Sequence, residues 1–335
     1  MSKISILGSG GWGTALAVMS AGLDHQVSVW SPFEDEVKNL ETKRENPLLK
    51  GIAIPDNITF TTDMTVAVDA DIIILAVPSF AMKSTTLKLA KIITQKSIVV
   101  NVSKGFDEES LRGLSDIIEE VLPNNPVVTL SGPSHAEEVA RGIPTSVVIA
   151  SKNHDAAKTV QDVLMHSELR IYTNDDIIGV ELGGALKNII ALATGICDGM
   201  GLGDNTKAAL ITRGIAEMSR LGKAMGAKVE TFMGLSGIGD LVVTCTSMHS
   251  RNRRFGILIG KGLDVETAQK EIGMTVEGYH ATKLAYRLAN KHGVEMPITN
   301  QCYKILYEGF SPNESIKLLM RRPKISENEV KYPIN

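Results

Sequence analysis

The first half of the chain alternates short apolar runs with stretches of helical periodicity. The runs are almost continuous in valine, isoleucine and leucine, which is typical of strands buried on both faces of a sheet. They fall at Ile4–Leu7, Val27–Trp30, Ile58–Phe60, Ile72–Val77, Ile98–Val102, Val127–Leu130 and Val147–Ala150. Helical stretches such as Ala15–Gly22 and Leu111–Val121 separate several of them. This alternation predicts a doubly wound α/β domain with a parallel sheet.

The second half has a different pattern. From about Ile177 to about Leu319 the apolar positions follow a helical period, interrupted by glycine and proline, and no strand is predicted. A chain of 335 residues is long enough for about two domains. We therefore expect an N-terminal α/β domain over residues 1–178, an all-helical domain over 179–322 and a polar tail over 323–335.

A glycine cluster follows the first predicted strand in the run KISILGSGGWGTALA, residues 3–17. Gly8, Gly10 and Gly13 form a G-x-G-x-x-G pattern at the start of a predicted helix, and Gly11 lies within it. Such glycines allow a tight turn, a close approach to a pyrophosphate and close packing of helix on strand. This context predicts a dinucleotide site, whereas the pattern by itself also fits a structural turn.

The end of the second predicted strand bears on the choice between NAD and NADP. An NAD enzyme usually has Asp or Glu there, about 20 residues beyond the glycines, but VSVW is followed by Ser31. Ser31, Pro32 and Glu34 resemble a capping box with proline at the first helical position. On that interpretation no carboxylate opposes a 2′-phosphate. The pattern therefore favours NADP without excluding NAD, and Ser31 is a candidate contact for either.

Polar residues follow three of the predicted strands. They are Pro78-Ser79, Ser103-Lys104-Gly105 and the segment from Ser131 to His135. In doubly wound sheets, ligands bind outside the carboxyl ends of the strands. Three polar loops at one sheet edge indicate a site, and Lys104 lies beside the predicted crevice.

A lysine interrupts the apolar stretch LGGALKNIIALATG, residues 182–195. On a helix, the neighbours of Lys187 are small or apolar, so no residue of its own face can pair with its charge. Gly183 and Gly184 clear space beside it at a cost in helix stability. A buried lysine needs a carboxylate or a ligand, and Asp240, in LSGIGDLVV, is a candidate partner, although it also fits a helix N-cap.

The segment SRNRRF contains Arg251, Asn252, Arg253 and Arg254. Arginine side chains bind phosphate oxygens well, and asparagine adds a donor. The segment is short and lacks aromatic residues, which disfavours nucleic acid. We therefore expect a phosphate site there. Further on, Val276 and Glu277 lie in a turn that is expected to close over a cofactor.

Composition narrows the remaining choices. The formal net charge is -3, which indicates no nucleic-acid or membrane partner. Cys197, Cys245 and Cys302 are widely spaced, which argues against disulfides and zinc, and we expect no metal. No apolar run reaches the roughly 18 residues of a membrane span, and no secretory signal precedes the first strand. We expect a cytoplasmic protein.

Taken together, these segments resemble the bacterial NAD(P)-dependent glycerol-3-phosphate dehydrogenase family. The resemblance covers about residues 4–310 and rests on GSGGWGTALA, VSKGFD, SGPSHAEEVA, GGALKNIIALATGICDG, ALITRGIAEM, GIGDLVVTCTSMHSRNRRFG, TVEGYHATK and GVEMPIT. It implies a Rossmann-type N-terminal domain, a helical C-terminal domain and a cytoplasmic homodimer. It also implies reversible NAD(P)H-dependent reduction of dihydroxyacetone phosphate to sn-glycerol 3-phosphate, which supplies glycerophospholipid synthesis.

The resemblance assigns roles position by position. Lys187 matches the proton acceptor, and we expect Asp240 and Lys104 to assist it as catalytic residues. The residues that we expect to bind substrate are Lys104, Gly132, Ser134, Lys187, Asn188, Asp240, Ser250, Arg251 and Asn252. The residues that we expect to bind cofactor are Gly8, Ser9, Gly10, Gly11, Trp12, Gly13, Ser31, Lys104, Ala136, Arg251, Val276 and Glu277.

Two alternatives remain at this point. One is a related two-domain dehydrogenase that acts on a hydroxy acid, a hydroxyacyl thioester or a phosphorylated sugar acid. The other is a non-catalytic nucleotide sensor, which would keep the glycine loop but has no need for Lys187, Asp240 and Arg251.

Overall fold

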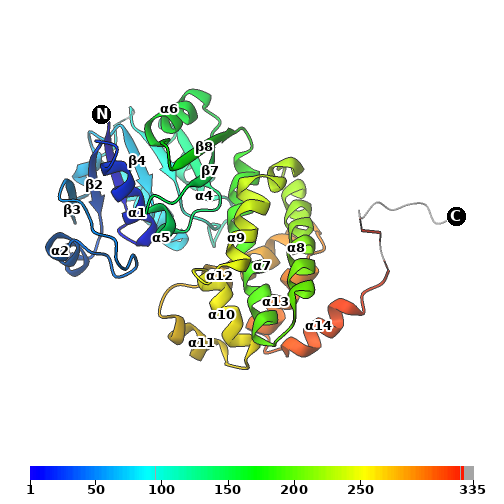
Figure 1. Cartoon of the computed structure of the whole chain (residues 1–335). Helices are drawn as coiled ribbons and strands as arrows, with labels where there is room; N and C mark the ends of the chain where they lie inside the picture. Colours follow the sequence, from blue (N-terminus) through cyan, green and yellow to red (C-terminus); the bar gives the residue numbers. More distant parts are fainter. Residues whose placement is uncertain (95, 325, 328–335) are drawn as a thin grey trace.

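A computed structural model describes residues 1–94, 96–324, 326 and 327. The predicted tail at 323–335 lies mostly outside these residues. The N-terminal half forms an eight-stranded sheet (Figure 1). The strands are β1 (Lys3–Leu7), β2 (Gln26–Trp30), β3 (Ile58–Thr61), β4 (Ile72–Leu75), β5 (Ile98–Asn101), β6 (Val127–Ser131), β7 (Thr145–Ala150) and β8 (Leu169–Asn174).

The strand order in the sheet is β3-β2-β1-β4-β5-β6-β7-β8. The chain moves outward from β1 to β3 and then returns to place β4 on the other side of β1, so the topological switch point lies between β1 and β4. Neighbouring strands are parallel except for β6 and β7, which are antiparallel. The prediction of a doubly wound α/β domain is confirmed, but a fully parallel sheet was wrong, and β8 was not predicted.

Helices cover both faces of the sheet. They are α1 (Gly11–Ala21), α2 (Glu34–Lys43), α3 (Met82–Leu89), α4 (Leu114–Val121), α5 (Ala136–Val139) and α6 (His154–Leu164). On one face α1 and α6 pack on alternate strand residues such as Ile4 and Ile72, and on the other face α3 and α4 pack on residues such as Ile73 and Val99. This two-sided burial explains the continuous apolar runs.

The turn after β2 differs from the predicted capping box. Phe33 has an extended backbone and is the N-cap of α2, which begins at Glu34 without a side-chain cap. Pro32 therefore lies outside the helix. The Ser31 hydroxyl donates a hydrogen bond to the Glu36 carboxylate at 2.6 Å instead of capping the helix. The prediction of a capping box was wrong.

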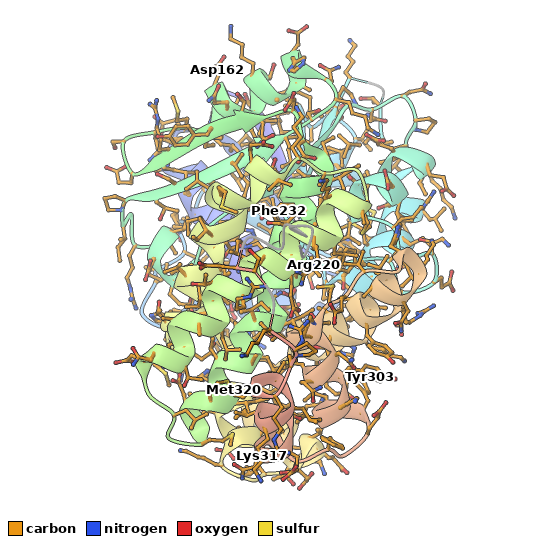
Figure 2. All side chains as sticks on the ribbon, turned by 90° about the vertical axis from the view of Figure 1, so that its right-hand side faces the viewer. Asp162, Arg220, Phe232, Tyr303, Lys317 and Met320 are labelled. Carbon is orange, nitrogen blue, oxygen red and sulfur yellow. The ribbon has the colours of Figure 1, made fainter. Side chains whose placement is uncertain are left out.

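The C-terminal half is helical. Its helices are α7 (Ile177–Gly199), α8 (Asp204–Ala224), α9 (Asp240–Thr246), α10 (Arg251–Gly260), α11 (Val265–Ile272), α12 (Glu277–His292), α13 (Pro297–Tyr307) and α14 (Pro312–Met320). Helix α7 lies at the centre, and α8, α9, α10, α12 and α13 pack around it. Phe232 is fully buried among these helices (Figure 2).

Among the described residues, α7 is the one helix long and apolar enough to cross a membrane. Of its most apolar window, 94% is buried inside the protein, which is typical of a core helix. Its length places side chains against both halves. Near its N-terminal end, the Glu181 carboxylate accepts hydrogen bonds from Ser115 and Asn101 of the sheet domain. Farther along, α7 carries Lys187 and Asn188.

Candidate active site

The glycine turn joins β1 to α1 at the switch point. Gly8 has φ +122°, and a Cβ there would lie 2.5 Å from the carbonyl oxygen of Ala76, just after β4. At Gly10, by contrast, a Cβ would meet nothing within 4 Å, and Gly10 caps α1 without a side-chain hydrogen bond. The turn therefore presents an open helix N-terminus to the carboxyl edge of the sheet, which fits the pyrophosphate of a dinucleotide.

The other predicted residues of this loop have structural contacts. Gly11 starts α1, and Gly13 lies so close to the Gly8 carbonyl that a Cβ would overlap it. The Ser9 carbonyl accepts hydrogen bonds from Thr14 and Asn46. Trp12 and Ala136 pack on the same small apolar cluster between α1 and α5. These contacts fix the shape of the loop.

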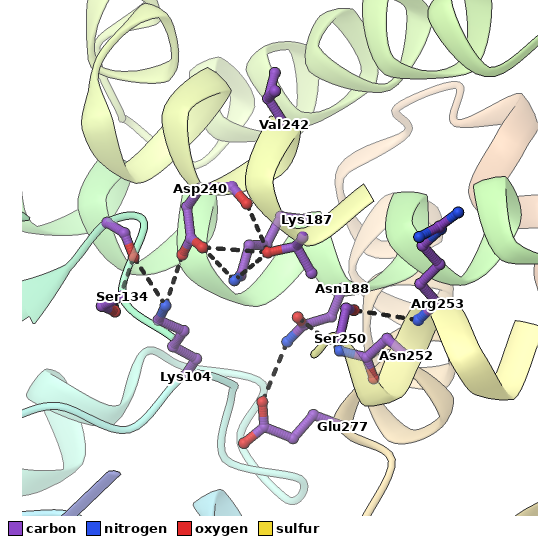
Figure 3. A network of polar contacts seen from close by, with 12 residues as sticks. Lys104, Ser134, Lys187, Asn188, Asp240, Val242, Ser250, Asn252, Arg253 and Glu277 are labelled. Carbon is purple, nitrogen blue, oxygen red and sulfur yellow. Dashed lines mark hydrogen bonds and ion pairs between the residues drawn. The ribbon is translucent and has the colours of Figure 1, made fainter. Parts of the chain in front are cut away.

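A lysine–aspartate–lysine cluster lies between the two halves (Figure 3). Asp240 is the first residue of α9, and its side chain does not cap that helix. One carboxylate oxygen accepts from Lys187 of α7, and the other accepts from Lys104 of the loop after β5 at 2.6 Å. The Lys104 ammonium also donates to the Gly132 carbonyl, at 3.2 Å. The structure thus brings together the three residues predicted to be catalytic.

Burial sets the charge balance of this cluster. Lys187 is 6% exposed and Asp240 is 1% exposed. Burial lowers the pKa of Lys187 to about 8, although Asp240 favours its charged form and Lys104 opposes it. Burial would raise the pKa of Asp240, but the two ammonium groups outweigh burial and hold it below its usual value. A lysine with a pKa near neutral can both donate and accept a proton.

Thr244 also belongs to the cluster. Its hydroxyl accepts a hydrogen bond from the Lys187 ammonium at 2.7 Å and donates to the Asp240 carbonyl, one turn earlier in α9, at 2.6 Å. Thr244 was not among the residues predicted from the sequence. A signal was available, because a polar residue four positions after a buried aspartate lies on the same helical face.

A second polar group lies beside the first and joins three helices. The Asn188 amide donates to Glu277 at 3.2 Å and accepts from Asn252 at 2.9 Å. The side-chain amide oxygen of Asn252 accepts a hydrogen bond from the backbone N–H of Gly278 at 2.8 Å. Asn188, Asn252 and Glu277 are therefore held together by α7, α10 and α12. Val276 is the buried N-cap residue of α12.

The arginine segment divides into two parts. The Ser250 hydroxyl caps α10 by accepting from the N–H of Arg253 at 3.2 Å. The Arg253 guanidinium binds Asp198 of α7 with two nitrogens, each at 2.8 Å, so it serves the packing of α10 on α7. Arg251, in contrast, is exposed at the first residue of α10. Arg251 is therefore the arginine of this pair that can reach a ligand.

Two further predicted residues lie at the end of β6. Gly132 has φ +126°, and its carbonyl accepts hydrogen bonds from Lys104 and from the Ser134 hydroxyl, the latter at 3.0 Å. Facing them, a Cβ on Gly184 of α7 would lie 2.7 Å from the Ser131 hydroxyl and 3.3 Å from the Lys104 side chain. Gly184 thus provides the space that the Lys104 side chain occupies.

Comparison with known proteins shows which family the chain belongs to. Residues 3–157 match the model of the NAD-dependent glycerol-3-phosphate dehydrogenase N-terminus, and residues 176–317 match that of the C-terminus. The chain belongs to this family. It is 52% identical to glycerol-3-phosphate dehydrogenase [NAD(P)+] of Thermoanaerobacter sp. (strain X514), over 97% of this chain and 98% of that protein.

Two further relatives support this assignment. The chain is 51% identical to glycerol-3-phosphate dehydrogenase [NAD(P)+] of Clostridium perfringens (strain SM101 / Type A), over 98% of this chain and 99% of that protein. The crystal structure of glycerol-3-phosphate dehydrogenase from Coxiella burnetii superposes with a TM-score of 0.93 at 41% identity, and the match covers 96% of this chain and 99% of that one. The predicted family is confirmed. Membership of this family favours glycerol-3-phosphate dehydrogenase activity over a related two-domain dehydrogenase or a non-catalytic nucleotide sensor.

Proposed function

We propose that the chain catalyses the reversible reduction of dihydroxyacetone phosphate to sn-glycerol 3-phosphate with NADH or NADPH. The family and its relatives support the reaction. One observation carries the chemistry: a buried lysine, Lys187, bridges to Asp240 at the junction of the two halves. We assign cofactor binding to residues 1–178 and the main substrate contacts to residues 179–322.

The proton transfer falls to Lys187. A bound dinucleotide supplies a hydride to the carbonyl carbon of the substrate. As the carbonyl oxygen gains negative charge, the Lys187 ammonium stabilises it and donates a proton. In the reverse direction the neutral amine accepts the hydroxyl proton. A pKa of about 8 serves both directions near neutral pH.

Asp240 and Lys104 complete the acid–base unit. Asp240 offsets the charge of both lysines and, together with Thr244, orients the Lys187 ammonium. Lys104 comes from the sheet domain, so it brings a second positive charge to the reacting oxygen from the cofactor side. It therefore serves both the substrate and the cofactor, and Asn188 lies next to Lys187 to assist in polarising the oxygen.

The substrate phosphate binds at the start of α10. Arg251 is exposed there, and the Ser250 hydroxyl and the Asn252 amide flank it. Gly132 and Ser134 face the cluster of Lys104, Asp240 and Lys187 from the end of β6. Binding the phosphate at a distance from the carbonyl positions the reacting carbon and contributes to catalysis as well as to affinity. On the cofactor side, Arg251, Val276 and Glu277 border the dinucleotide.

Replacing Lys187 tests the proposal. We expect Lys187→Ala to reduce turnover by about a thousandfold, within the range for loss of a general acid–base group, while NADH binding measured by fluorescence titration stays near that of the parent protein. Lys207→Ala is a matched control, because Lys207 is a half-buried lysine that pairs with Asp198 away from the cluster. Near-normal turnover in Lys187→Ala would refute the proton-transfer role.

The cellular setting belongs to the same proposal. We place the enzyme in the cytoplasm as a homodimer that supplies glycerol 3-phosphate for glycerophospholipid synthesis. The three cysteines are free and buried, which suits a reducing compartment. Sedimentation velocity tests the dimer, and loss of phospholipid synthesis after gene deletion, restored by added glycerol 3-phosphate, tests the pathway.

A further inference from the structure

The end of β2 lies next to the glycine turn. The N–H of Gly8 donates to the carbonyl of Trp30, the last residue of β2, at 2.9 Å. Ser31 follows directly and is 1% exposed. Its hydroxyl donates to a carboxylate oxygen of Glu36 at 2.6 Å. A negative charge from five residues farther along the chain is therefore held at the strand end that faces the ribose of a bound dinucleotide in this fold.

The surrounding charges are also negative. Glu34, Asp35 and Glu36 all lie in the first turn of α2, where a helix N-terminus would otherwise attract a phosphate. Among the described residues, Glu36 forms no ion pair. The nearest arginine in the sequence, Arg44, lies at the far end of α2 and binds Glu41 and the Ile58 carbonyl.

We infer that Glu36, held by Ser31, makes this enzyme select NAD(H) over NADP(H). This rests on the proposed dehydrogenase function and specifies its cofactor. A carboxylate accepts hydrogen bonds from ribose hydroxyls, and the second oxygen of Glu36 has no partner among the described residues. The same carboxylate repels a 2′-phosphate, and among the described residues no cation pairs with it to offset that repulsion. Ser31 is a positioning residue, because it acts through Glu36.

The inference departs from the sequence-based preference for NADP, which depended on a capping box. Had α2 begun at Pro32, the Ser31 side chain would have served the helix and Glu36 would have had no fixed place. Because α2 begins two residues later, the Ser31 hydroxyl is available to Glu36. The five-residue spacing between these two positions explains why the acid was not recognised directly after β2.

Equilibrium binding tests this directly. NADH and NADPH are titrated into the full-length protein and followed by nicotinamide fluorescence, and ADP-ribose and its 2′-phosphate are compared by calorimetry. We expect the parent protein to bind NADH at least about tenfold more tightly than NADPH, which corresponds to about 1.4 kcal/mol. We expect Glu36→Gln to reduce that ratio at least about fivefold, mainly by tighter NADPH binding as the repulsion is lost.

Glu34→Gln is the matched control. It removes the same charge from the same helical turn, but the Glu34 side chain is exposed, and the Ser31 hydroxyl bonds to Glu36 instead. We expect it to leave the ratio within about twofold, since an exposed charge is screened by solvent. Ser31→Ala should lower the preference for NADH over NADPH although the charge of Glu36 is retained. That result would identify the positioning of Glu36 as the role of Ser31.

The outcomes separate the two proposals. Equal affinity for NADH and NADPH in the parent protein, or a ratio that Glu36→Gln does not change, would overturn the inference and leave the dehydrogenase function intact. If Glu34→Gln changed the NADH-to-NADPH affinity ratio as much as Glu36→Gln, the total negative charge of the helical turn would be responsible, not the position of the Glu36 carboxylate. That result would also overturn the inference. Failure to bind either dinucleotide would overturn the proposed function as well.

Discussion

Asp240→Asn is the most informative change in the active site. It keeps the shape of the side chain but removes the only negative charge that contacts both Lys104 and Lys187 among the described residues. An asparagine can accept from one ammonium group, but its NH2 group then faces the other. The buried Lys187 and the half-buried Lys104 are left without a compensating negative charge, which strongly favours loss of a proton from Lys187.

The size of the effect follows from the geometry. A pair of charges about 4 Å apart interacts by about 4 kcal/mol at an effective dielectric constant of about 20. At about 1.36 kcal/mol per pH unit, loss of this attraction shifts the titration of Lys187 downward by about three pH units. The pH above which ketone reduction declines should move from about 8 in the parent protein to well below neutral.

The assay is the pH profile of kcat/KM for dihydroxyacetone phosphate reduction. Reduction requires protonated Lys187, so the parent rate should fall as pH rises through about 8. In Asp240→Asn the rate at pH 7.5 should fall about a hundredfold or more, because the lysine is then mostly neutral. At pH 5.5 the loss should be less than about tenfold, because much of the lysine is protonated again.

Asp198→Asn serves as the control, because Asp198 also pairs with two cations, Arg253 and Lys207, but not with Lys187. It should leave the pH at which the rate declines unchanged. The reasoning is refuted if the profile of Asp240→Asn has the shape of the parent profile, with the same loss at every pH, while NADH binding is retained.

Three further predictions follow from other contacts. Arg251→Ala should raise the KM for dihydroxyacetone phosphate about tenfold or more with a smaller change in kcat, as expected for loss of a charged phosphate contact; an unchanged KM would place phosphate binding elsewhere. Gly184→Ala should lower kcat, because the added methyl group would lie 2.7 Å from the buried Ser131 hydroxyl and 3.3 Å from the Lys104 side chain, so that both must shift; an unchanged kcat would refute the steric argument. Burial raises the pKa of Glu181 to about 7 in the folded protein, so its contribution to stability is full below about pH 4.3 and is lost as pH rises to about 7. In denaturant unfolding, Glu181→Gln should therefore lose less stability over that range than the parent protein; equal slopes would contradict the assignment.

The fold was largely predictable because its signals are local. Strands buried on both faces are continuous in apolar residues, and the helical half keeps one period over many turns. The strand β8 escaped prediction because it lies at the sheet edge, where the exposed Tyr172 and the buried Ile171 give an alternating pattern. The reversal between β6 and β7 depends on packing between distant segments, which no local pattern records.

The active site was predictable in part. The isolation of Lys187 on its own helix indicated a partner elsewhere, and Asp240 proved to be that partner. The sequence could not show that Asp240 also binds Lys104, because 136 residues separate these positions. The separate tasks of Arg251 and Arg253 were hidden for the same reason, since the partner of Arg253 lies on another helix.

The division of the acid–base unit between the two halves has an evolutionary consequence. Lys187 and Asp240 come from the helical half, but Lys104 comes from the dinucleotide-binding half. Neither half can be exchanged for that of a relative unless the donor also supplies the matching member of the cluster. Turnover by a hybrid protein would therefore report whether halves from two different relatives dock in the native register. Because both halves contribute contacts to Asp240, we expect them to evolve together.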